Sequence, residues 1–410
     1  MTTAPPCRLC AAPLTETFVD LGMSPPCENF LSEDQLDQME EFFPLHVRVC
    51  SSCLLVQLPA YIAASDIFSH YAYFSSYSDS WVEHARRFVE DATERLGLGS
   101  DSFVVEVASN DGYLLQHAVA HGIRSLGIEP AANVAEVAVA RGVPTEVHFL
   151  GAVTGEAVAK EHGKADLVVA NNVFAHVPDI VDFARGLRAL VSDSGFVSIE
   201  IPHLLRLVDS REYDTIYHEH FSYLSLLTTQ RVLTKAGLTV VDVQELSTHG
   251  GSLRTWSTPS ENAGTPSETV SKVLADEAAA GLHTLEGHAG FGSAVAGIRN
   301  DIMEFLVECS RKGASVAGYG APGKGNTLLN HCGIRSDLLE YTVDRNPFKH
   351  GKFLPGTHIP IHPVERLAET RPDYIVIMPW NLRDEIATQL AYTREWGAHL
   401  VVALPELEVF

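Results

Sequence analysis

Long hydrophobic runs are absent from this sequence. No apolar stretch approaches the roughly 18 residues that a membrane-spanning helix requires. The first ten residues, MTTAPPCRLC, contain neither the basic segment nor the apolar segment of a secretory signal peptide. We therefore expect a cytoplasmic protein with no membrane partner.

Positive charge is also scarce. The 410 residues include 29 Lys and Arg against 52 Asp and Glu, which gives a formal net charge of −23. A surface with this balance repels phosphate backbones, so we expect no nucleic-acid partner. A small anionic substrate remains compatible with this charge, because a single pocket can be basic. The composition is typical of a globular protein, and the length predicts roughly two to four domains. We expect a monomer or a weak oligomer.

Cysteine is present in a number that argues against disulfides, since the chain has seven and no export signal. Four of them form two Cys-x-x-Cys pairs, Cys7 with Cys10 and Cys50 with Cys53. Two such turns supply the four soft ligands of a tetrahedral zinc ion, and a closed four-cysteine shell indicates a structural metal. Two unrelated pairs, or a redox pair, are the alternatives. Residues between the pairs are expected to form a small subdomain whose last part returns as a strand.

Strands and helices alternate in the middle of the chain. Residues 103–122 and 124–142 each read as a buried strand, a turn and a helix, and further strands follow within 144–151, 165–179 and 195–203. This alternation is typical of a doubly wound parallel sheet. After a helix within 225–237, two strands at 238–246 and 252–259 are joined by a tight turn. A terminal hairpin on a parallel sheet resembles the class I S-adenosylmethionine (SAM) methyltransferase fold.

That resemblance implies a set of cofactor contacts. In this fold an acidic residue and a glycine-rich turn follow the first strand, and a second acidic residue ends the second strand. Such a strand-end carboxylate can bind both ribose hydroxyls, and glycine allows a close backbone approach. The positions that match are Glu106, Ser109, Asn110, Asp111 and Gly112 in the first turn and Glu129 at the second strand. The resemblance also implies that Asn171 and Asn172, at the end of the fourth strand, lie at the methionine end of the cofactor. Ordinary surface charge is the alternative for the two glutamates.

The segment YHEHFSYLSL, residues 217–226, follows the fifth predicted strand. It lies on the side where α/β sheets bind ligands. His218 and His220 are both metal-ligand types, but their spacing offers no obvious third ligand. A buried polar cluster is a second possibility. The position at the carboxyl edge of the sheet favours catalysis over both.

The motifs together are similar to one enzyme family. The four-cysteine site is followed by YAYFSSYSDSW at 71–81, SNDG, NNVFAHVPD, IEIPHLL, YHEHFSYLS, HGGSLR and GYGAPGKGNTLL. This combination, over essentially the whole chain, resembles the sugar C-methyltransferases, which act on nucleotide-linked 4-keto-6-deoxy sugars in antibiotic pathways. The resemblance implies methyl transfer to C3′ of a TDP-linked 4-keto-deoxy sugar, such as a 3-amino-2,3,6-trideoxy sugar.

The resemblance also implies catalytic roles. The C4′ ketone acidifies the C3′ proton, and His220 is the base that removes it. Tyr217 donates to the developing enolate oxygen. Glu219 orients a ring or receives the amine of the substrate, while His176 and Tyr71 are further active-site residues. A SAM-dependent O- or N-methyltransferase is an alternative, because a histidine base serves those reactions too.

The last part of the chain predicts a second Rossmann-like unit. A helical connector at 261–310 precedes a strand, a glycine-rich turn and a helix within 314–333. The turn, GYGAPGKG, resembles a dinucleotide fingerprint, so an NAD(P)-dependent sugar oxidoreductase is a further alternative. In the family resembled, this domain faces the SAM domain and helps to hold the nucleotide sugar. The substrate-binding candidates are therefore Gly320, Gly323, Lys324, Trp380 and Asn381. A degenerate duplicate that only supports the cleft is the other interpretation.

The predicted organisation is α/β throughout. Residues 1–65 are expected to form a zinc-binding module. Residues 66–260 form the SAM methyltransferase domain with its leading helical linker. Residues 261–410 form the connector and the C-terminal Rossmann-like domain.

Overall fold

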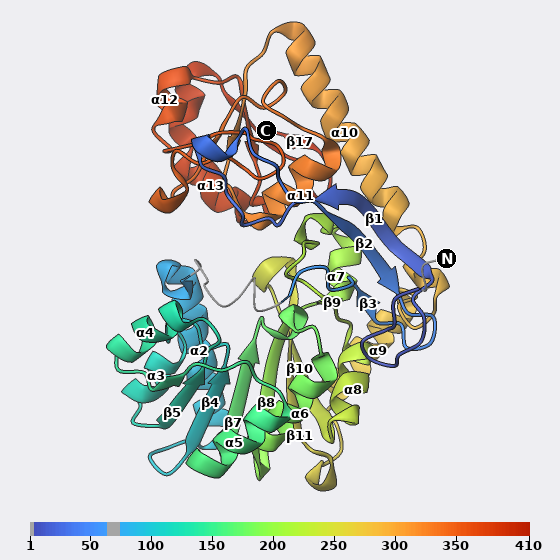
Figure 1. The fold of residues 1–410 in the computed structure, drawn as a ribbon, viewed down its shortest axis with the longest axis vertical. Helices are drawn as coiled ribbons and strands as arrows, with labels where there is room; N and C mark the ends of the chain where they lie inside the picture. The colour runs from blue at the N-terminus through green and yellow to red at the C-terminus, as the bar shows by residue number, and fades with distance from the viewer. Residues whose placement is uncertain (1–3, 64–73) are drawn as a thin grey trace. The chain divides into compact units, whose positions relative to one another are not determined.

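The computed structural model of the chain describes residues 4–63 and 74–410. It divides into two compact units (Figure 1). The first unit consists of Met1–Thr15, Cys50–Leu204 and Phe221–Leu285, and the second of Glu16–Val49, Leu205–His220 and Glu286–Phe410. The predicted boundaries at 65 and 260 therefore fall inside the first unit.

A seven-stranded sheet forms the centre of the first unit, in the order β10-β11-β8-β7-β4-β5-β6. Its strands are β4 (Phe103–Val107), β5 (Arg124–Ile128), β6 (Thr145–Glu146), β7 (Ala165–Asn171), β8 (Val191–Pro202), β10 (Leu238–Leu246) and β11 (Ser252–Pro259). The strands from β4 to β8 are parallel, whereas β11 runs antiparallel to β8 and to β10. The predicted parallel sheet with a terminal hairpin is confirmed.

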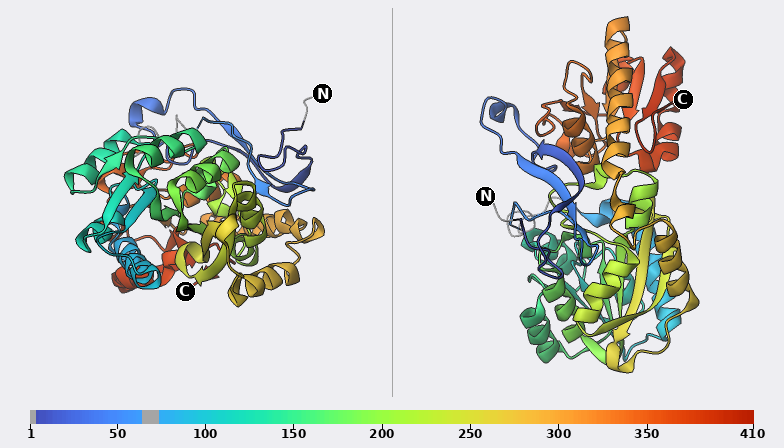
Figure 2. Two further views of the ribbon diagram at one scale, coloured as in Figure 1. Left: turned by 90° about the horizontal axis from the view of Figure 1, so that it is seen from below. Right: turned by 90° about the vertical axis from the view of Figure 1, so that its right-hand side faces the viewer.

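Helices cover both faces of this sheet (Figure 2). They are α2 (Asp79–Leu96), α3 (Leu115–Ala120), α4 (Ala132–Ala140), α5 (Ala152–His162), α6 (Ile180–Leu190), α8 (Leu226–Lys235) and α9 (Glu268–Ala279). Every residue of β4 is buried. Val105 and Val107 pack in a core with α5, α6 and α8, while Val104 packs in a core with α2 and α3. This two-sided burial explains why the strand is apolar on both faces, with Glu106 as its one polar residue, rather than alternating.

The second unit contains a six-stranded sheet in the order β14-β13-β12-β15-β16-β17. Its strands are β12 (Val316–Tyr319), β13 (Thr342–Val343), β14 (Ile361–His362), β15 (Tyr374–Ile377), β16 (His399–Val402) and β17 (Glu408–Val409). All are parallel except β17. The helices of this unit include α10 (Phe291–Lys312), α11 (Gly323–Cys332), α12 (Arg366–Thr370) and α13 (Arg383–Gln389). A second parallel α/β sheet was predicted, and it is confirmed.

Most of the chain between the two cysteine pairs, Glu16–Val49, also belongs to the second unit. It forms the antiparallel strands β1 (Glu16–Ser24) and β2 (Phe43–Val49), so the predicted returning strand is present. The chain does not fold out as a separate subdomain, because the apolar face of β1 needs a cover. Helix α10 supplies it, and the ring of Phe18 stacks on Phe291 with centroids 4.6 Å apart.

None of the helices within the described ranges combines the length and the apolar character that crossing a bilayer would require.

Candidate active site and metal site

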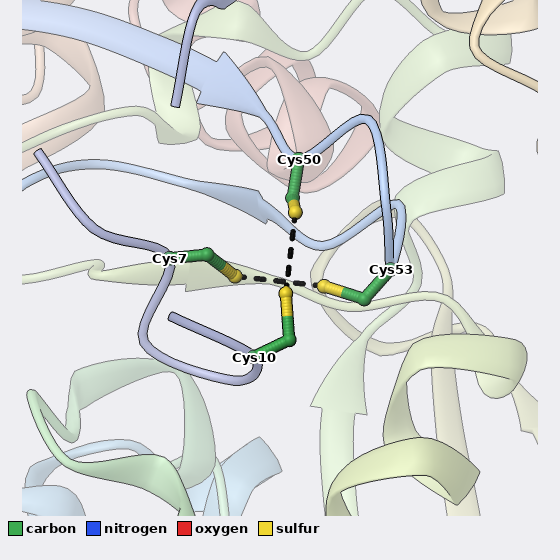
Figure 3. A group of neighbouring side chains, drawn as sticks. All are labelled: Cys7, Cys10, Cys50 and Cys53. Carbon is green, nitrogen blue, oxygen red and sulfur yellow. Dashed lines mark hydrogen bonds between the residues drawn. The ribbon is translucent and has the colours of Figure 1, made fainter. Parts of the chain in front are cut away.

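The four predicted metal ligands lie together in the first unit (Figure 3). The Sγ atoms of Cys7 and Cys53 are 3.5 Å apart, as are those of Cys10 and Cys50, and all four lie within 4.8 Å of one another. With Zn–S bonds of about 2.3 Å, a tetrahedral site needs sulfur atoms roughly 3.8 Å apart. The donor set and its spacing therefore fit zinc.

Both Cys-x-x-Cys turns have the same backbone form. Ala11 donates its N–H to the carbonyl of Cys7, and Leu54 donates to that of Cys50. These two donors have φ values of +62° and +61°. Repetition of a left-handed residue after each pair shows that both turns are built to aim two sulfurs at one point.

The turn after β4 is held by a hydrogen bond to the carboxylate of Glu129. Asn110 and Ala108, with φ values of +50° and +55°, fold the chain back at the carboxyl edge of the sheet. One Glu129 oxygen accepts the N–H of Asn110 and the other accepts that of Ala131, each at 2.9 Å. Gly112 has φ +79°, and a Cβ there would lie 2.9 Å from Val143. Glycine is therefore required for packing at this position.

Several buried polar atoms at this edge have no hydrogen-bond partner among the described residues. They are Glu106 Oε2, Ser109 Oγ, Asn171 Oδ1 and both amide atoms of Asn172. They come from the ends of β4 and β7, which are neighbours in the sheet. An unpartnered buried polar group costs about 1–3 kcal/mol, so these atoms fit a polar ligand such as the amino-acid and ribose parts of SAM. Burial, with the nearby Glu129, raises the pKa of Glu106 well above its usual value.

A contact that sequence reasoning missed closes the turn from the other side. The helical turn Ser75–Tyr77 donates the N–H of Ser75 to the Asn110 side chain at 2.8 Å, and the hydroxyl of Ser76 to Asp111. Arg141 forms an ion pair with Asp111 at 2.8 Å. The contact between Ser75 and Asn110 has one signal in the sequence, the position of Ser75 in the motif at 71–81. Tyr71, in the same motif, lies outside the described residues.

His176 is placed at the end of a helical turn, Phe174–His176, that follows β7. The carbonyl of Ala175 accepts the N–H of Phe221 at 2.8 Å. The residue that follows His220 in the chain is therefore fixed beside the residue that precedes His176.

The first four residues of the predicted catalytic segment, Tyr217 to His220, belong to the second unit, and the rest belong to the first. His220 donates Nδ1–H to the carbonyl of Thr215 at 2.7 Å, since a carbonyl can only accept. Its ring lies 4.1 Å from that of Tyr217, centroid to centroid. Glu219 is 9% exposed, and its Oε1 lies 3.8 Å from the Sγ of Cys27. Cys27 is itself buried, at the side of this segment.

The glycine-rich turn after β12 is closely packed. A Cβ on Gly320 would lie 2.7 Å from Pro379, and one on Gly323 would lie 2.9 Å from the Sγ of Cys27. The carboxylate of Glu28 lies against the N–H of Gly323 at the start of α11, where a dinucleotide would place its phosphates. An acidic side chain at this point disfavours the oxidoreductase alternative.

Three of the predicted substrate-binding side chains do lie together. Lys324 Nζ is 5.1 Å from the centroid of the Trp380 ring and 3.5 Å from Asn381 Oδ1. Trp380 in turn donates its indole N–H to the buried Asp214 at 2.8 Å. The two glycines face protein atoms, as described above. Binding of substrate by this set stays a prediction.

Glu212, near Lys324, has a raised pKa. It is 3% exposed, and burial raises its pKa to about 7, with the charge of Asp214 adding to the rise and that of Lys324 opposing it. The sequence held no local signal for this shift.

Three family models match the chain. A zinc binding domain matches residues 7–68, a methyltransferase domain matches 81–243, and a C-methyltransferase C-terminal domain matches 247–405. The C-methyltransferase NovU of Streptomyces niveus is 36% identical over 403 residues, covering 98% of this chain and 96% of its own length.

Solved structures resemble part of the chain. A SAM-dependent methyltransferase from Clostridium acetobutylicum has 8% identity and a TM-score of 0.34, covering 43% of this chain and 91% of its own. Magnesium protoporphyrin IX methyltransferase from Synechocystis with bound SAM has 15% identity and a TM-score of 0.32, covering 44% and 81%. These scores are too low to support an argument.

We predict one zinc ion per chain, held by the four clustered cysteines. Cys50→Ser should lose the metal and lower the melting temperature, because metal binding contributes directly to folding. Elemental analysis of the purified protein measures the zinc. Cys309→Ser, which removes a buried thiol outside the cluster, should keep full zinc content. A wild-type protein without zinc would contradict the prediction.

We predict that Glu129 binds the ribose of SAM as well as bracing the turn. Glu129→Ala should weaken SAM binding at least tenfold, since a hydrogen bond to a charged group contributes about 1.5–3 kcal/mol. Calorimetry measures the affinity. Glu136→Ala, on the exposed side of α4, is the matched control. Unchanged SAM affinity in the Glu129 variant would place the ribose elsewhere.

The raised pKa of Glu212 predicts a pH-dependent stability. The folded state holds this proton more tightly than the unfolded state, so the stabilisation is complete below about pH 4.5 and is lost as pH rises through about 7. The unfolding free energy of the wild type should fall by roughly 2–3 kcal/mol relative to Glu212→Gln over that interval. Denaturant titrations at several pH values test this, with exposed Glu395→Gln as control. Parallel pH profiles for wild type and Glu212→Gln would refute it.

Proposed function

This chain belongs to the C-methyltransferase family, with SAM as its cofactor and zinc in its four-cysteine site, and from that premise we propose that it methylates C3′ of a nucleotide-linked 4-keto-deoxy sugar. The similarity to NovU supports methyl transfer to carbon. The sugar is proposed from the motif resemblance, with a TDP-linked 3-amino-2,3,6-trideoxy sugar as the preferred substrate. The observation that carries the mechanism is the hydrogen bond of His220 to Thr215.

A carbon nucleophile needs a base, because a C–H bond next to a ketone must first lose its proton. When bound, SAM supplies an electrophilic methyl group on its sulfonium. The protein must remove the C3′ proton, hold the resulting enolate and exclude water. Histidine suits the first task, since its pKa lies near neutral pH.

The hydrogen bond to Thr215 fixes the tautomer of His220. The carbonyl of Thr215 accepts at 2.7 Å, so Nδ1 carries the hydrogen. In the neutral ring, Nε2 is then the unprotonated nitrogen. This is the protonation state that a general base requires before it takes a proton.

Tyr217 and Glu219 are proposed to assist. Tyr217 lies against the His220 ring, and its hydroxyl is a candidate donor to the enolate oxygen at C4′. The carboxylate of Glu219 is buried with Cys27 as a neighbour, which suits a site for the amine of a 3-amino sugar. His176 and Tyr71 complete the proposed catalytic set.

The proposed substrate is tested directly by mass spectrometry. A panel of TDP-linked 4-keto sugars, with and without a 3-amino group, is incubated with SAM and the purified protein. A gain of one methyl group that is stable to hydrolysis and located at C3′ is expected. Methylation only at oxygen or nitrogen would refute the proposal.

We predict that His220→Asn lowers kcat about 10²–10⁴-fold with little change in SAM affinity, because a positioned base contributes that much to rate. It should also abolish exchange of the C3′ proton in deuterated water when the demethylated cofactor replaces SAM. NMR of the substrate measures the exchange. His218→Asn makes the same substitution two residues away and should retain turnover. Near-wild-type turnover of His220→Asn under single-turnover conditions would assign the base to another residue.

A further inference from the structure

Helix α11 of the second unit contacts the chain segment that leads to the catalytic histidine. Lys324, Thr327 and His331 lie on one face of this helix, at i, i+3 and i+7. His331 packs edge-on against the ring of Tyr213, with centroids 5.3 Å apart. Thr327 donates its hydroxyl to the carbonyl of Ile216 at 2.8 Å. One helix face therefore supports the segment from Tyr213 onward.

Three successive carbonyl groups of this segment have assigned partners. The carbonyl of Thr215 accepts from His220 Nδ1 at 2.7 Å, that of Ile216 accepts from Thr327 at 2.8 Å, and that of Tyr217 accepts the N–H of His220 at 2.9 Å. Two of the three bonds hold His220 itself. The central one is the bond made by the helix.

The central bond restricts the backbone between the other two. Adjacent peptide planes share a Cα atom, and each residue has only two soft dihedral angles. A bond to the Ile216 carbonyl therefore restricts ψ of Ile216 and φ of Tyr217, and it holds the two Cα atoms from which the neighbouring peptide planes continue. Thr327 is 2% exposed and Ile216 is fully buried, so water does not replace the hydroxyl at this point.

A second bond fixes the start of the segment. The indole N–H of Trp380 donates to Asp214 Oδ2 at 2.8 Å, and Asp214 is 1% exposed. Asp214 belongs to the short helical turn Tyr213–Thr215, and Ile216 follows that turn directly. The segment is thus held at these two residues by side chains more than 100 residues away in the sequence.

We propose that Thr327 is a positioning residue for His220. Its hydroxyl holds the Ile216 carbonyl, between the Thr215 and Tyr217 carbonyls that bond His220, and so helps to keep the Thr215 carbonyl where it fixes the Nδ1–H tautomer and the direction of Nε2. This inference rests on the proposed role of His220 as base. It gives the second α/β sheet a task in catalysis that does not require the glycine-rich turn to bind a nucleotide.

The test compares three variants. Thr327→Val keeps the shape of the side chain and removes the hydroxyl, whereas Thr327→Ser keeps the hydroxyl. Thr393→Val is the matched control, because Thr393 is fully buried in the same unit and donates to the carbonyl of Leu390 at the same distance of 2.8 Å. Thr327→Val and Thr393→Val should lower the melting temperature by similar amounts.

Only Thr327→Val should lower kcat and the rate of C3′ proton exchange, by about 10- to 100-fold, the effect of a displacement near 1 Å at a reacting group. Thr327→Ser should restore both, and SAM affinity should be unchanged in all three. Equal kcat in Thr327→Val and Thr393→Val, or no restoration by serine, would overturn the proposal. If Thr327→Val does not fold, Thr327→Ala is compared with Thr327→Ser in the same way.

A spectroscopic measurement separates this inference from the proposed substrate. Nitrogen NMR of His220, assigned by comparison with His220→Asn, reports which ring nitrogen carries the proton without any substrate. The wild type should show the Nδ1–H tautomer, and Thr327→Val a mixture of both. An unchanged tautomer would overturn the positioning role even if every sugar in the panel is methylated. A mixture of both tautomers in Thr327→Val would support the positioning role even if no sugar in the panel is methylated.

Discussion

The carboxylate of Glu129, which follows strand β5, holds the turn after β4 at the ligand-binding edge of the first unit. Glu129 accepts the N–H of Asn110, a residue whose positive φ costs a non-glycine side chain about 1–2 kcal/mol. A hydrogen bond to a charged acceptor contributes about 1.5–3 kcal/mol, so the brace is strong enough to hold the turn. The second unit repeats the device, because Asp344 accepts the N–H of Ala321 in the turn after β12 at 2.7 Å. In both α/β sheets, therefore, a carboxylate accepts a backbone N–H of the turn that follows β4 or β12.

The surroundings of the two braces differ, and this difference separates their roles. Around Glu129, the buried polar atoms of Glu106 and Asn172 lack partners among the described residues, as expected where a polar ligand binds. Around Asp344, the turn is filled by protein atoms, and Glu28 lies at the start of α11. The first turn is built to bind a ligand. The second is built to hold a helix, and that helix bears Thr327.

The sequence predicted the features that depend on neighbouring residues. The buried strands carry long apolar runs, and the metal site follows from the spacing within each Cys-x-x-Cys pair. Contacts between distant residues left no such signal. The pattern of β1 shows that one face is apolar, but not that Phe291 covers it. In the same way, nothing near Thr327 or Ile216 indicates that the two are bonded, since 111 residues separate them.

Local hydrogen bonds alone could not hold residues 212–220, which lead to and include His220, in one conformation. Fixing one residue costs about 1–2 kcal/mol of backbone entropy, so residues 212–220 cost on the order of 10 kcal/mol. Each intramolecular hydrogen bond returns only about 0.5–1.5 kcal/mol, so the bonds that these residues form among themselves do not offset that cost. Burial of large side chains must supply the rest, and Tyr213, which is fully buried against α11, is the largest of them. Because packing is not directional, it brings the segment to the helix without setting the rotation of its peptide planes. A hydrogen bond is directional, so the hydroxyl of Thr327 adds the orientation that packing leaves open.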